Sequence, residues 1–452
     1  MTRSIYFLAV VLLLAGCRKY VEIDQIGKRT LKYTKDYRAL LDNTSLLEGS
    51  FGLSIYLGDD TRFLDSSKQV AMSDINSNAY TWQEQFWSEI QADADWEKLY
   101  NVIYHSNVAL AGVMESETGT TEEKQQLYAE ALVHRAYAYW CLVNLYGKQY
   151  DNATANTDMA VPLLLSPDLF VNLTRTSVAN VYDRIINDLN AALPSLPDLP
   201  DYNTRPSKAG VYAVLARTYL GMRDFYNARA NAEKVLSLQN TLLDLRTYAT
   251  STTGFPYRTA DPEVIMSKIA TGVYTGIQLD TALLSLLGAK DLRYTLFVKP
   301  GGNFSPTFNG YGYWRYRYTR EGNVIFQGPR VPEMMLIKAE CAARSGDATT
   351  AVDLLNTIRQ KRFLAADYTA LSAGTATEAL ALVVNERKRE FFGTGLRWLD
   401  QKRLNRDAAF AATVTRRFKG VDYKLEPNSN RYIYPIGLKY ILLNPELAQS
   451  PR

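Results

Sequence analysis

The stretch ALVHRAYAYWCLVNLYG, residues 131–147, belongs to the clearest helix in the chain, which we predict from about Thr121 to Tyr146. Hydroxyl and acidic side chains at residues 120–123 suit a helix N-terminus. Gly147 stands where a C-cap residue belongs. A helix of this length supplies a framework for packing other helices, so we expect a mainly α-helical protein built outward from it.

Two later segments, residues 208–238 and 333–359, have the pattern of helical hairpins. In each, a short polar turn separates two runs of apolar residues at helical spacing. Two antiparallel helices need small residues where their backbones approach, and this arrangement is typical of tetratricopeptide (TPR) repeats. Generic helical hairpins are the alternative. In both segments, alanines stand twelve positions apart: Ala216 and Ala228, and Ala339 and Ala351.

The rest of the chain divides into helices and irregular segments. We predict further helices near residues 34–37, 95–114 and 177–193, and a proline-rich break over residues 194–206. Residues 49–95 are loop-rich and aromatic. Residues 241–330 are rich in Gly, Pro, Thr and Tyr, and the alternation in Tyr313–Tyr318 predicts strands in an irregular insertion.

The N-terminal residues have the features of an export signal. Arg3 supplies a positive charge, and an uninterrupted apolar run follows from Ile5 to Ala15. This run is shorter than the roughly 20 residues needed to span a bilayer, and it fits the apolar core of a signal peptide. Leu14-Ala15-Gly16-Cys17 has the form of a lipobox, in which small residues precede the cysteine that receives the lipid. We therefore expect a signal peptide over residues 1–16, a lipid on Cys17 and a tether over residues 17–35, with a short buried helix as the alternative.

Composition excludes several functional classes. The net charge of +4 falls to +3 without residues 1–16, whose only charged residue is Arg3, and no Lys/Arg run suggests nucleic acid. The remaining cysteines, Cys141 and Cys341, lie among apolar neighbours and are expected as free buried thiols, with a disulfide as the alternative. With His105 and His134 as the only histidines, no zinc-type cluster occurs. We expect no metal and no cofactor.

Four motifs along the chain resemble the signatures of one family. Read in order behind the lipobox, they are similar to those of SusD/RagB proteins, the surface nutrient-binding lipoproteins of Bacteroidetes. The resemblance covers essentially the whole chain after Cys17. The motifs are residues 131–147; Gly328-Pro329-Arg330 with Glu333–Glu340; Asn385–Glu390 with Gly395–Asp400 and Arg403; and Tyr434-Pro435-Ile436 through Asn444–Leu447.

The chain also departs from the family pattern. Thr394 stands where the family usually has Glu, Leu396 stands where it often has His, and Gln449-Ser450 replaces the usual Gln-Asn. These changes are expected to alter local packing and not the fold. The chain is also short for the family, so it could lack loops that shape a large glycan site. The ligand class therefore stays open between glycan and peptide.

The resemblance implies a fold and a domain plan. We expect a mainly α, TPR-like helical hairpin scaffold of the SusD-like type, with loop-rich, partly β insertions. After the tether, a single SusD-like domain would cover residues 36–452. It would comprise a helical part with ligand loops (36–240), the irregular insertion (241–330) and the C-terminal signature region (331–452).

The resemblance also implies a function. The protein would bind nutrient oligosaccharide at the cell surface and deliver it to a SusC-like TonB-dependent transporter, anchored by lipid to the outer membrane. A peptide-binding lipoprotein of the RagB type and a TPR scaffold without a ligand are the alternatives. A glycan-degrading enzyme is not expected, because no G-x-S-x-G, Walker, H-E-x-x-H or Rossmann motif occurs. Glu386 and Glu390 lie one helical turn apart, as a glycosidase pair could, but the surrounding arginines predict a structural ion-pair network.

Ligand residues in this family tend to come from loops between the first and second signatures and just before them. Sugar rings expose flat C–H faces, so aromatic side chains beside short polar ones are the residues to look for. Two segments of this chain contain both aromatic and short polar residues. The resemblance implies that the ligand site lies in this region, but it does not identify individual residues. The candidates are Asn76, Asn78, Tyr80 and Trp82, and Tyr274, Tyr313 and Trp314.

Overall fold

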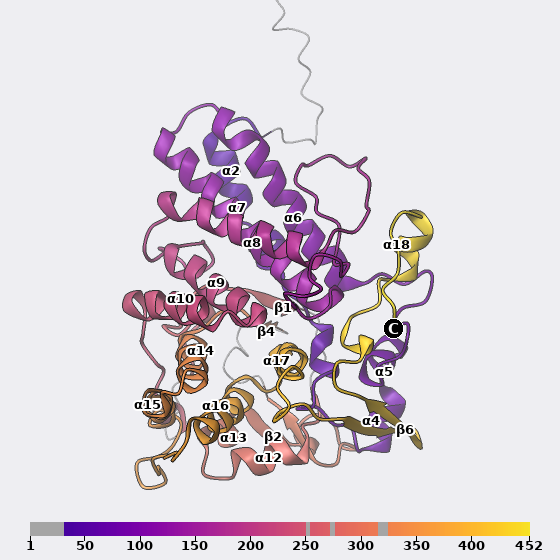
Figure 1. Ribbon diagram of the computed structural model, residues 1–452, viewed down its shortest axis with the longest axis vertical. Coiled ribbons are helices and arrows are strands. Elements are labelled where there is room, and N and C mark those ends of the chain that lie inside the picture. Colours follow the sequence, from indigo (N-terminus) through magenta and orange to yellow (C-terminus); the bar gives the residue numbers. More distant parts are fainter. Residues whose placement is uncertain (1–30, 250–253, 272–275, 315–323) are drawn as a thin grey trace, which may run out of the picture.

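The computed structural model describes residues 31–249, 254–271, 276–314 and 324–452. Its architecture is mainly α-helical, with small two-stranded sheets among the described residues, which confirms the predicted fold class. Successive helices form stacked layers from the N-terminal to the C-terminal part of the chain (Figure 1). The predicted signal peptide, residues 1–16, and Cys17 lie outside the described residues. The first described helix begins at Thr34, so its first two residues fall within the expected tether.

The long helix α7 (Thr121–Tyr146) is the centre of the first layer and has the predicted bounds. Its N-terminus is closed by a capping box between Thr120 and Glu123. Every residue from Ala129 to Tyr146 is buried, as expected for a helix that is covered on all sides. The helices packed around it are α2 (Thr34–Leu41), α6 (Ala94–Gly112) and α8 (Val178–Ala192).

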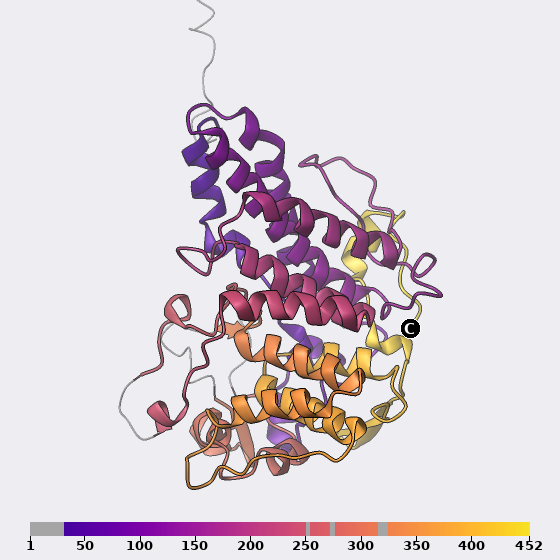
Figure 2. The same cartoon turned by 60° about the vertical axis from the view of Figure 1, so that its left-hand side comes forward.

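The two predicted hairpins are present below this layer. They are α9 (Lys208–Met222) with α10 (Phe225–Leu238), and α14 (Val331–Arg344) with α15 (Ala348–Arg359). All four spaced alanines, Ala216, Ala228, Ala339 and Ala351, are fully buried, which agrees with close helix approach. Helix α10 packs on α14, and α16 (Ala376–Phe391) packs on both α14 and α15, so the helices stack in consecutive rows (Figure 2).

The irregular insertion contains short strands, as expected, and also short helices that were not predicted. Strand β1 (Ile269–Thr271) pairs with β4 (Val324–Phe326), and β2 (Val298–Pro300) pairs with β3 (Tyr311–Tyr313), both antiparallel. Helices α12 (Thr281–Leu287) and α13 (Leu292–Phe297) complete this region. The strand predicted over Tyr313–Tyr318 is described only up to Trp314, because residues 315–323 lie outside the described residues.

The C-terminal region contains a hairpin that sequence reasoning missed. After α17 (Leu396–Leu404), strand β5 (Val414–Phe418) pairs antiparallel with β6 (Val421–Leu425). The two-residue turn between them is Lys419-Gly420, and both residues have positive φ, 47° and 84°, as a tight hairpin turn requires. A short helix, α18 (Leu438–Leu443), lies near the C-terminus.

The aromatic segment 49–95 is short-helical rather than open loop. It contains η2 (Leu53–Tyr56), α4 (Ser66–Ala71) and α5 (Asp74–Tyr80), which lie beside the C-terminal hairpin (Figure 1). Cys141 and Cys341 are buried free thiols, as predicted. None of the described helices combines the length and the apolar character that crossing a membrane would require.

Candidate functional site

Two of the predicted ligand aromatics, Tyr80 and Trp82, belong to the core. Both side chains are fully buried. The Arg416 guanidinium from β5 lies 4.1 Å from the Tyr80 ring centre and 4.3 Å from that of Trp82. The Trp82 indole nitrogen also donates a hydrogen bond to the Leu57 carbonyl, at 3.2 Å. The expectation that these rings stack on a ligand is therefore corrected, because in this structure neither ring presents a face to solvent.

Asn76 and Asn78 stand on the same helix, α5, but have different surroundings. The Asn78 side chain donates to the Phe86 carbonyl, at 3.3 Å, and so holds the chain that follows α5. Asn76 is half-buried and lines two adjoining cavities. Of the four candidates in this segment, Asn76 is therefore the one placed to contact a ligand in a cavity.

The larger of these cavities, which we call the Asn76 cleft, has a volume of about 330 Å³. Its walls come from η2, α5, the start of α6 and β1, with the loop before α6 between them. They combine aromatic side chains, carboxylates and an amide, which is the mixture that a polar ligand with flat apolar faces needs. The lining residues are Gly52, Leu53, Tyr56, Ile75, Asn76, Trp87, Ala92, Asp93, Ala94, Asp95 and Thr271.

Two buried carboxylates, Asp93 and Asp95, lie in the wall of the Asn76 cleft. Asp93 caps α6 by accepting hydrogen bonds from the N–H groups of Asp95 and Trp96, and its other oxygen accepts from the Tyr146 hydroxyl at 2.6 Å. Asp95 accepts from the N–H groups of Gly52 and Leu53, at 2.7 and 3.1 Å. These hydrogen bonds fix both carboxylates in place and tie η2 to α6.

The ionisation of the two carboxylates is governed by burial. Burial and the neighbouring charge of Asp95 raise the pKa of Asp93 well above its ordinary value. Burial also raises the pKa of Asp95 to about 6, against the lowering effect of the Gly52 and Leu53 N–H groups. Near neutral pH the two carboxyl groups therefore carry less negative charge than exposed Asp side chains do. Their oxygens suit hydroxyl or amide donors better than they suit an anionic ligand.

A second cavity of about 140 Å³ adjoins the cleft and shares Tyr56 and Asn76 with it. Lys68 lines this cavity, and its ammonium group lies 4.4 Å from the ring centre of Phe308. Phe308 packs on Phe304, and Phe304 packs edge-on against Trp314 at 5.7 Å. Ring contacts thus connect Trp314 with Lys68, which lines the same cavity as Asn76.

The remaining candidates are not brought to the Asn76 cleft. Tyr313 packs edge-on against Phe392 and lines a different, smaller cavity of about 50 Å³ beside Arg293 and Glu390. Trp314 is half-buried, and its backbone N–H donates a hydrogen bond to the Phe297 carbonyl. Tyr274 lies outside the described residues, three positions after Thr271. Cys17 does as well, so the structure does not test these two assignments.

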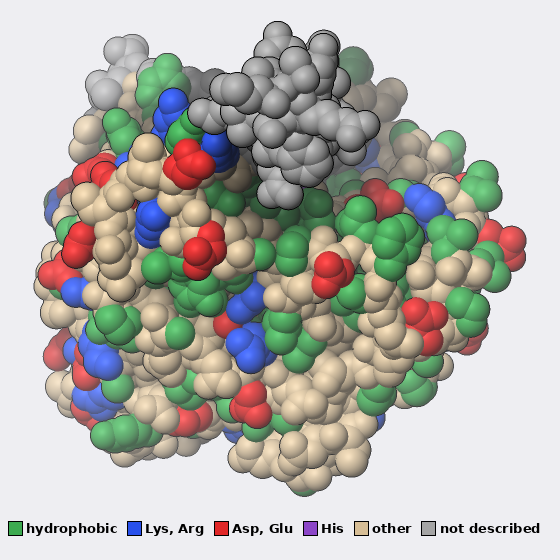
Figure 3. Space-filling view, turned by 90° about the horizontal axis from the view of Figure 1, so that it is seen from above, with side chains coloured by type: hydrophobic (Ala, Val, Ile, Leu, Met, Phe, Trp, Pro, Cys, Tyr) green, Lys and Arg blue, Asp and Glu red, His purple; other side chains and the backbone are tan. Residues whose placement is uncertain are grey.

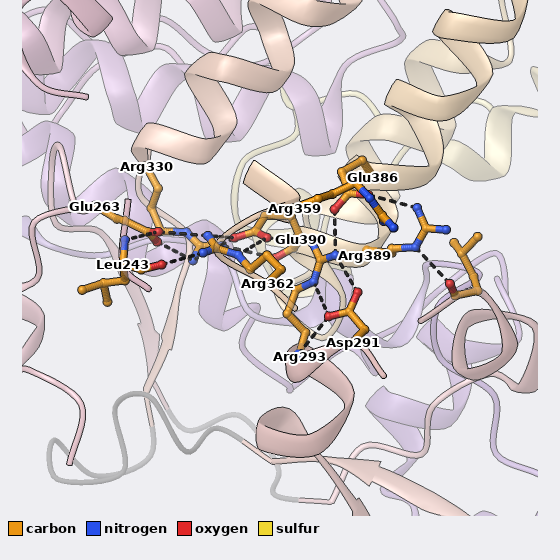
Figure 4. Close-up of polar contacts among 11 residues, drawn as sticks. Leu243, Glu263, Asp291, Arg293, Arg330, Arg359, Arg362, Glu386, Arg389 and Glu390 are labelled. Atoms are coloured by element: carbon orange, nitrogen blue, oxygen red, sulfur yellow. Dashed lines mark hydrogen bonds and ion pairs between the residues drawn. The ribbon is translucent and has the colours of Figure 1, made fainter. Parts of the chain in front are cut away.

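The paired carboxylates Glu386 and Glu390 form the predicted ion-pair network (Figure 4). Arg293 binds Glu386 at 2.7 Å and Glu390 at 2.9 Å, and Arg362 binds Glu390 at 3.0 Å. Burial alone would raise their pKa, but the arginines hold the pKa of both carboxyl groups below its ordinary value. A general acid needs a raised pKa, so this environment does not suit a general acid. The ion pairs join α16 to α13 and α15.

The charges on the surface are mixed. On the face seen in Figure 3, the described acidic side chains lie among the lysines and arginines, and these basic side chains form no continuous stripe. Nucleic-acid binding by a basic patch finds no support there. Nor do the described residues contain a group of three or more His, Cys, Asp or Glu side chains that could hold a metal ion.

Sequence reasoning missed most of the residues that form the Asn76 cleft. Tyr56 and Trp87 were expected only as parts of an aromatic, loop-rich segment, and Asp93 and Asp95 were not singled out. One local pattern in this part of the sequence is informative. Asp93 stands directly before Ala94-Asp95-Trp96, as an N-cap residue stands before a helix. That pattern predicts a helix start but not a cavity wall.

The sequence comparisons with known proteins all give SusD-like proteins. Residues 29–220 match a SusD-like family model described as "Starch-binding associating with outer membrane". SusD-like protein P2 of Formosa agariphila is 26% identical, over 89% of this chain and 90% of the relative. SusD-like protein P38 of the same organism is 22% identical, over 78% of each chain.

Solved structures have the same fold. A SusD superfamily protein from Bacteroides thetaiotaomicron matches 93% of this chain and all of its own, with a TM-score of 0.75 and 20% identity. A laminarin-binding SusD-like protein matches 93% of this chain and 99% of its own, with a TM-score of 0.67 and 18% identity. At these identities the structural likeness shows the fold alone.

Proposed function

Because this chain is a member of the SusD-like family, we propose that it binds a nutrient oligosaccharide at the cell surface and delivers it to a SusC-like TonB-dependent transporter. The observation that carries the binding step is the Asn76 cleft. It brings the Asn76 amide, the aromatic residues Tyr56 and Trp87, and the acidic residues Asp93 and Asp95 to one cavity. Hydroxyl groups need such acceptors and donors, and the C–H faces of sugar rings pack against the faces of aromatic rings.

The same proposal includes the site of attachment. The family model describes outer-membrane association, and the lipobox before Cys17 supplies a way to achieve it. A lipid on Cys17, followed by a tether and a single domain over residues 36–452, would hold the cleft near a transporter without a membrane-spanning helix. A single acyl chain binds membranes only marginally, whereas several chains on one residue give stable anchoring.

We further propose that the protein binds its ligand without converting it. SusD-like proteins are binding proteins, and Glu386 and Glu390 are held ionised by arginines. Asp93 and Asp95 have raised pKa values, but their oxygens already accept hydrogen bonds from the protein. Their proposed role is to hold the cleft wall.

The test is a binding panel with purified protein lacking residues 1–16. Starch, laminarin, other neutral glycans, acidic glycans and mixed peptides are titrated by calorimetry, and the products are inspected for cleavage. We expect binding to at least one glycan, which Asn76→Ala weakens about tenfold, the effect of roughly 1.4 kcal/mol. Asn180→Ala, on the exposed surface of α8, is the matched control.

The outcomes separate the alternatives. Binding to peptides but to no glycan would replace the glycan proposal with a peptide-binding one. Binding to nothing in the panel, with the transporter complex intact, would support a scaffold without a ligand. Release of shorter products would establish catalysis.

A further inference from the structure

The buried guanidinium of Arg416 joins two walls of the Asn76 cleft, although Arg416 itself belongs to the β5–β6 hairpin. Arg416 is only 2% exposed. Its Nη1 atom donates hydrogen bonds to the carbonyls of Tyr56 and Tyr80, at 2.8 and 2.5 Å. Tyr56 is the last residue of η2, and Tyr80 is the last residue of α5. One nitrogen atom therefore connects the helix that carries Tyr56 with the helix that carries Asn76, and both of these residues line the cleft and the adjoining cavity.

The other terminal nitrogen of Arg416 fixes the chain that follows η2. Nη2 donates to the carbonyls of Leu57, Gly58 and Thr61, at 3.1, 2.5 and 3.3 Å. The last carbonyls of a helix have no partners within the helix and carry a partial negative charge, so they favour a cation. An arginine presents its donors in a rigid planar fork, whereas a lysine presents one compact charge. Arg416 therefore acts as a shared C-terminal cap for η2 and α5.

The hairpin that carries Arg416 is itself fixed to the helices around the cleft, beside which it lies (Figure 1). The backbone N–H of Lys419 donates to the Gln69 side chain on α4, at 2.6 Å, and the Gln69 amide donates to the Arg417 carbonyl, at 3.4 Å. The Phe418 ring packs on the Tyr80 ring, with 5.5 Å between their centres. The hairpin thus cannot shift relative to α4 and α5 without breaking these contacts.

The backbone directly after α5 has a strained conformation. Trp82 has a φ of 53°, which bulky residues rarely adopt. Its indole nitrogen donates to the Leu57 carbonyl that Arg416 also binds, and Arg431 donates to the Trp82 carbonyl at 3.0 Å. Such a conformation persists only where the surrounding contacts hold it, and it is frequent at ligand clamps. The strain at Trp82 is therefore a second observation that the position of α5 is fixed from outside the helix.

We propose that Arg416 is a positioning residue for ligand binding, which sets the separation of η2 and α5 and so the width of the Asn76 cleft. Arg416 is not among the residues that line the cleft or the adjoining cavity, so it acts through Tyr56 and Asn76 without touching the ligand. The inference rests on the proposed function, because it concerns the same cleft. It makes a residue near the C-terminus responsible for a ligand site built near the N-terminus.

Four variants of the protein lacking residues 1–16 separate positioning from stability. Arg416→Met keeps the apolar stem and removes the guanidinium, and Arg416→Lys keeps the charge without the planar fork. The matched controls are Arg217→Met and Arg217→Lys. Arg217 on α9 is also buried, and it binds Glu333 and the Gln327 carbonyl away from the cleft. Each variant is measured at a temperature at which circular dichroism shows it folded.

Hydrogen–deuterium exchange of the ligand-free proteins is the first measurement. In Arg416→Met, the amides of residues 53–61 and 74–82 should exchange at least about tenfold faster than in the wild type, because local opening then breaks fewer contacts. The amides of α14 should be unchanged, and Arg416→Lys should give a smaller increase. The Arg217 variants should leave both cleft segments as they are in the wild type. Equal exchange of the cleft segments in Arg416→Met and the wild type would overturn the proposal.

Titration with soluble starch and with laminarin is the second measurement. For either glycan that binds the wild type, Arg416→Met should weaken binding about tenfold, because the cleft is no longer preorganised. The Arg217 variants should bind as the wild type does. Unchanged affinity in Arg416→Met, or an equal loss in Arg217→Met, would overturn the proposal.

The proposed function and the role of Arg416 fail separately. If neither glycan binds the wild type, the proposed function fails for these ligands, and the exchange measurement alone decides the role of Arg416. Failure of both Arg416 variants to fold, while an Arg217 variant folds, would assign Arg416 to the stability of the whole domain and would also overturn the proposal.

Discussion

Arg403 on α17 binds Glu340 on α14 through two parallel contacts, Nη1···Oε1 at 2.7 Å and Nη2···Oε2 at 2.8 Å. Both side chains are buried. The Arg403 Nε atom also donates to Asp400, at 2.8 Å. This pair joins the second and third sequence motifs, which are separated by α15 and α16 in the chain.

Removal of either partner of this pair should destabilise the protein strongly. Arg403→Met leaves Glu340 buried with its charge less compensated, and Glu340→Gln does the same to Arg403. We expect each to lower the free energy of unfolding by about 3–5 kcal/mol, measured by urea denaturation. Arg417→Met breaks an exposed pair with Asp422 and should cost less than about 1 kcal/mol. Equal small effects at both sites would contradict this prediction.

The parts of the fold that could be predicted are those fixed by local sequence. Helix α7 has the predicted bounds because Thr120, Glu123 and Gly147 mark its ends within the chain itself. The buried alanines of the two hairpins followed from their spacing, since the helix repeat puts them on one face. These features depend on a few residues, and those residues are close to one another in the sequence.

The parts that could not be predicted depend on contacts between distant residues. Tyr80 and Trp82 have the residue types of a ligand surface, but contacts with Arg416 and Phe418, from a hairpin near the other end of the chain, help to place them in the core. Likewise, Asp93 and Asp95 become a cavity wall because η2 and α5 fold over the start of α6. Neither arrangement leaves a pattern in the sequence.

The two tryptophans predicted as ligand anchors should now behave differently. Trp82→Ala removes a fully buried ring and should lower the free energy of unfolding by about 3–5 kcal/mol. Trp314→Ala alters a half-buried ring packed on Phe304 and should cost less. Urea denaturation of both variants, with glycan titrations beside it, checks this. A small stability change for Trp82→Ala would show that the ring is not part of the core.

The lipid assignment at Cys17 is tested in cells. Cys17→Ala removes the thiol that receives the lipid, so the variant should accumulate as unprocessed or soluble protein. Incorporation of labelled fatty acid should be lost. Cys141→Ala, at a buried free thiol, should keep the label. Labelling that persists in Cys17→Ala would refute the assignment.

The proposed transporter complex predicts co-purification. Stacked helical layers offer broad faces for a partner, and a permanent complex buries more than roughly 2,000 Å². Mild detergent extraction at native expression should therefore recover the protein with a β-barrel transporter. Recovery as a free monomer while the transporter is present would count against delivery, although glycan binding could remain.

The buried carboxyl of Asp95 makes stability depend on pH. Its pKa is raised to about 6 in the folded protein, whereas an unfolded Asp titrates near 3.9. Between these values the folded state holds one more proton than the unfolded state, so stability falls as pH rises. Two pKa units correspond to about 3 kcal/mol. Relative to Asp95→Asn, the wild-type protein should therefore lose roughly 2 kcal/mol between pH 4 and pH 7, because an unfolded Asp is already about half ionised at pH 4.

Asp407 provides the matched control, because its shift has the opposite sign. Burial raises its pKa, but ion pairs with Arg223 and Arg344 outweigh burial and lower it. Its stabilising contribution is complete above the pKa of an unfolded Asp and is lost only as pH falls below it. Urea denaturation across pH 5 to 7 should thus give a constant difference between the wild type and Asp407→Asn. Over the same interval the difference from Asp95→Asn should change steadily, and a flat difference there would show that Asp95 is ionised normally in the cleft.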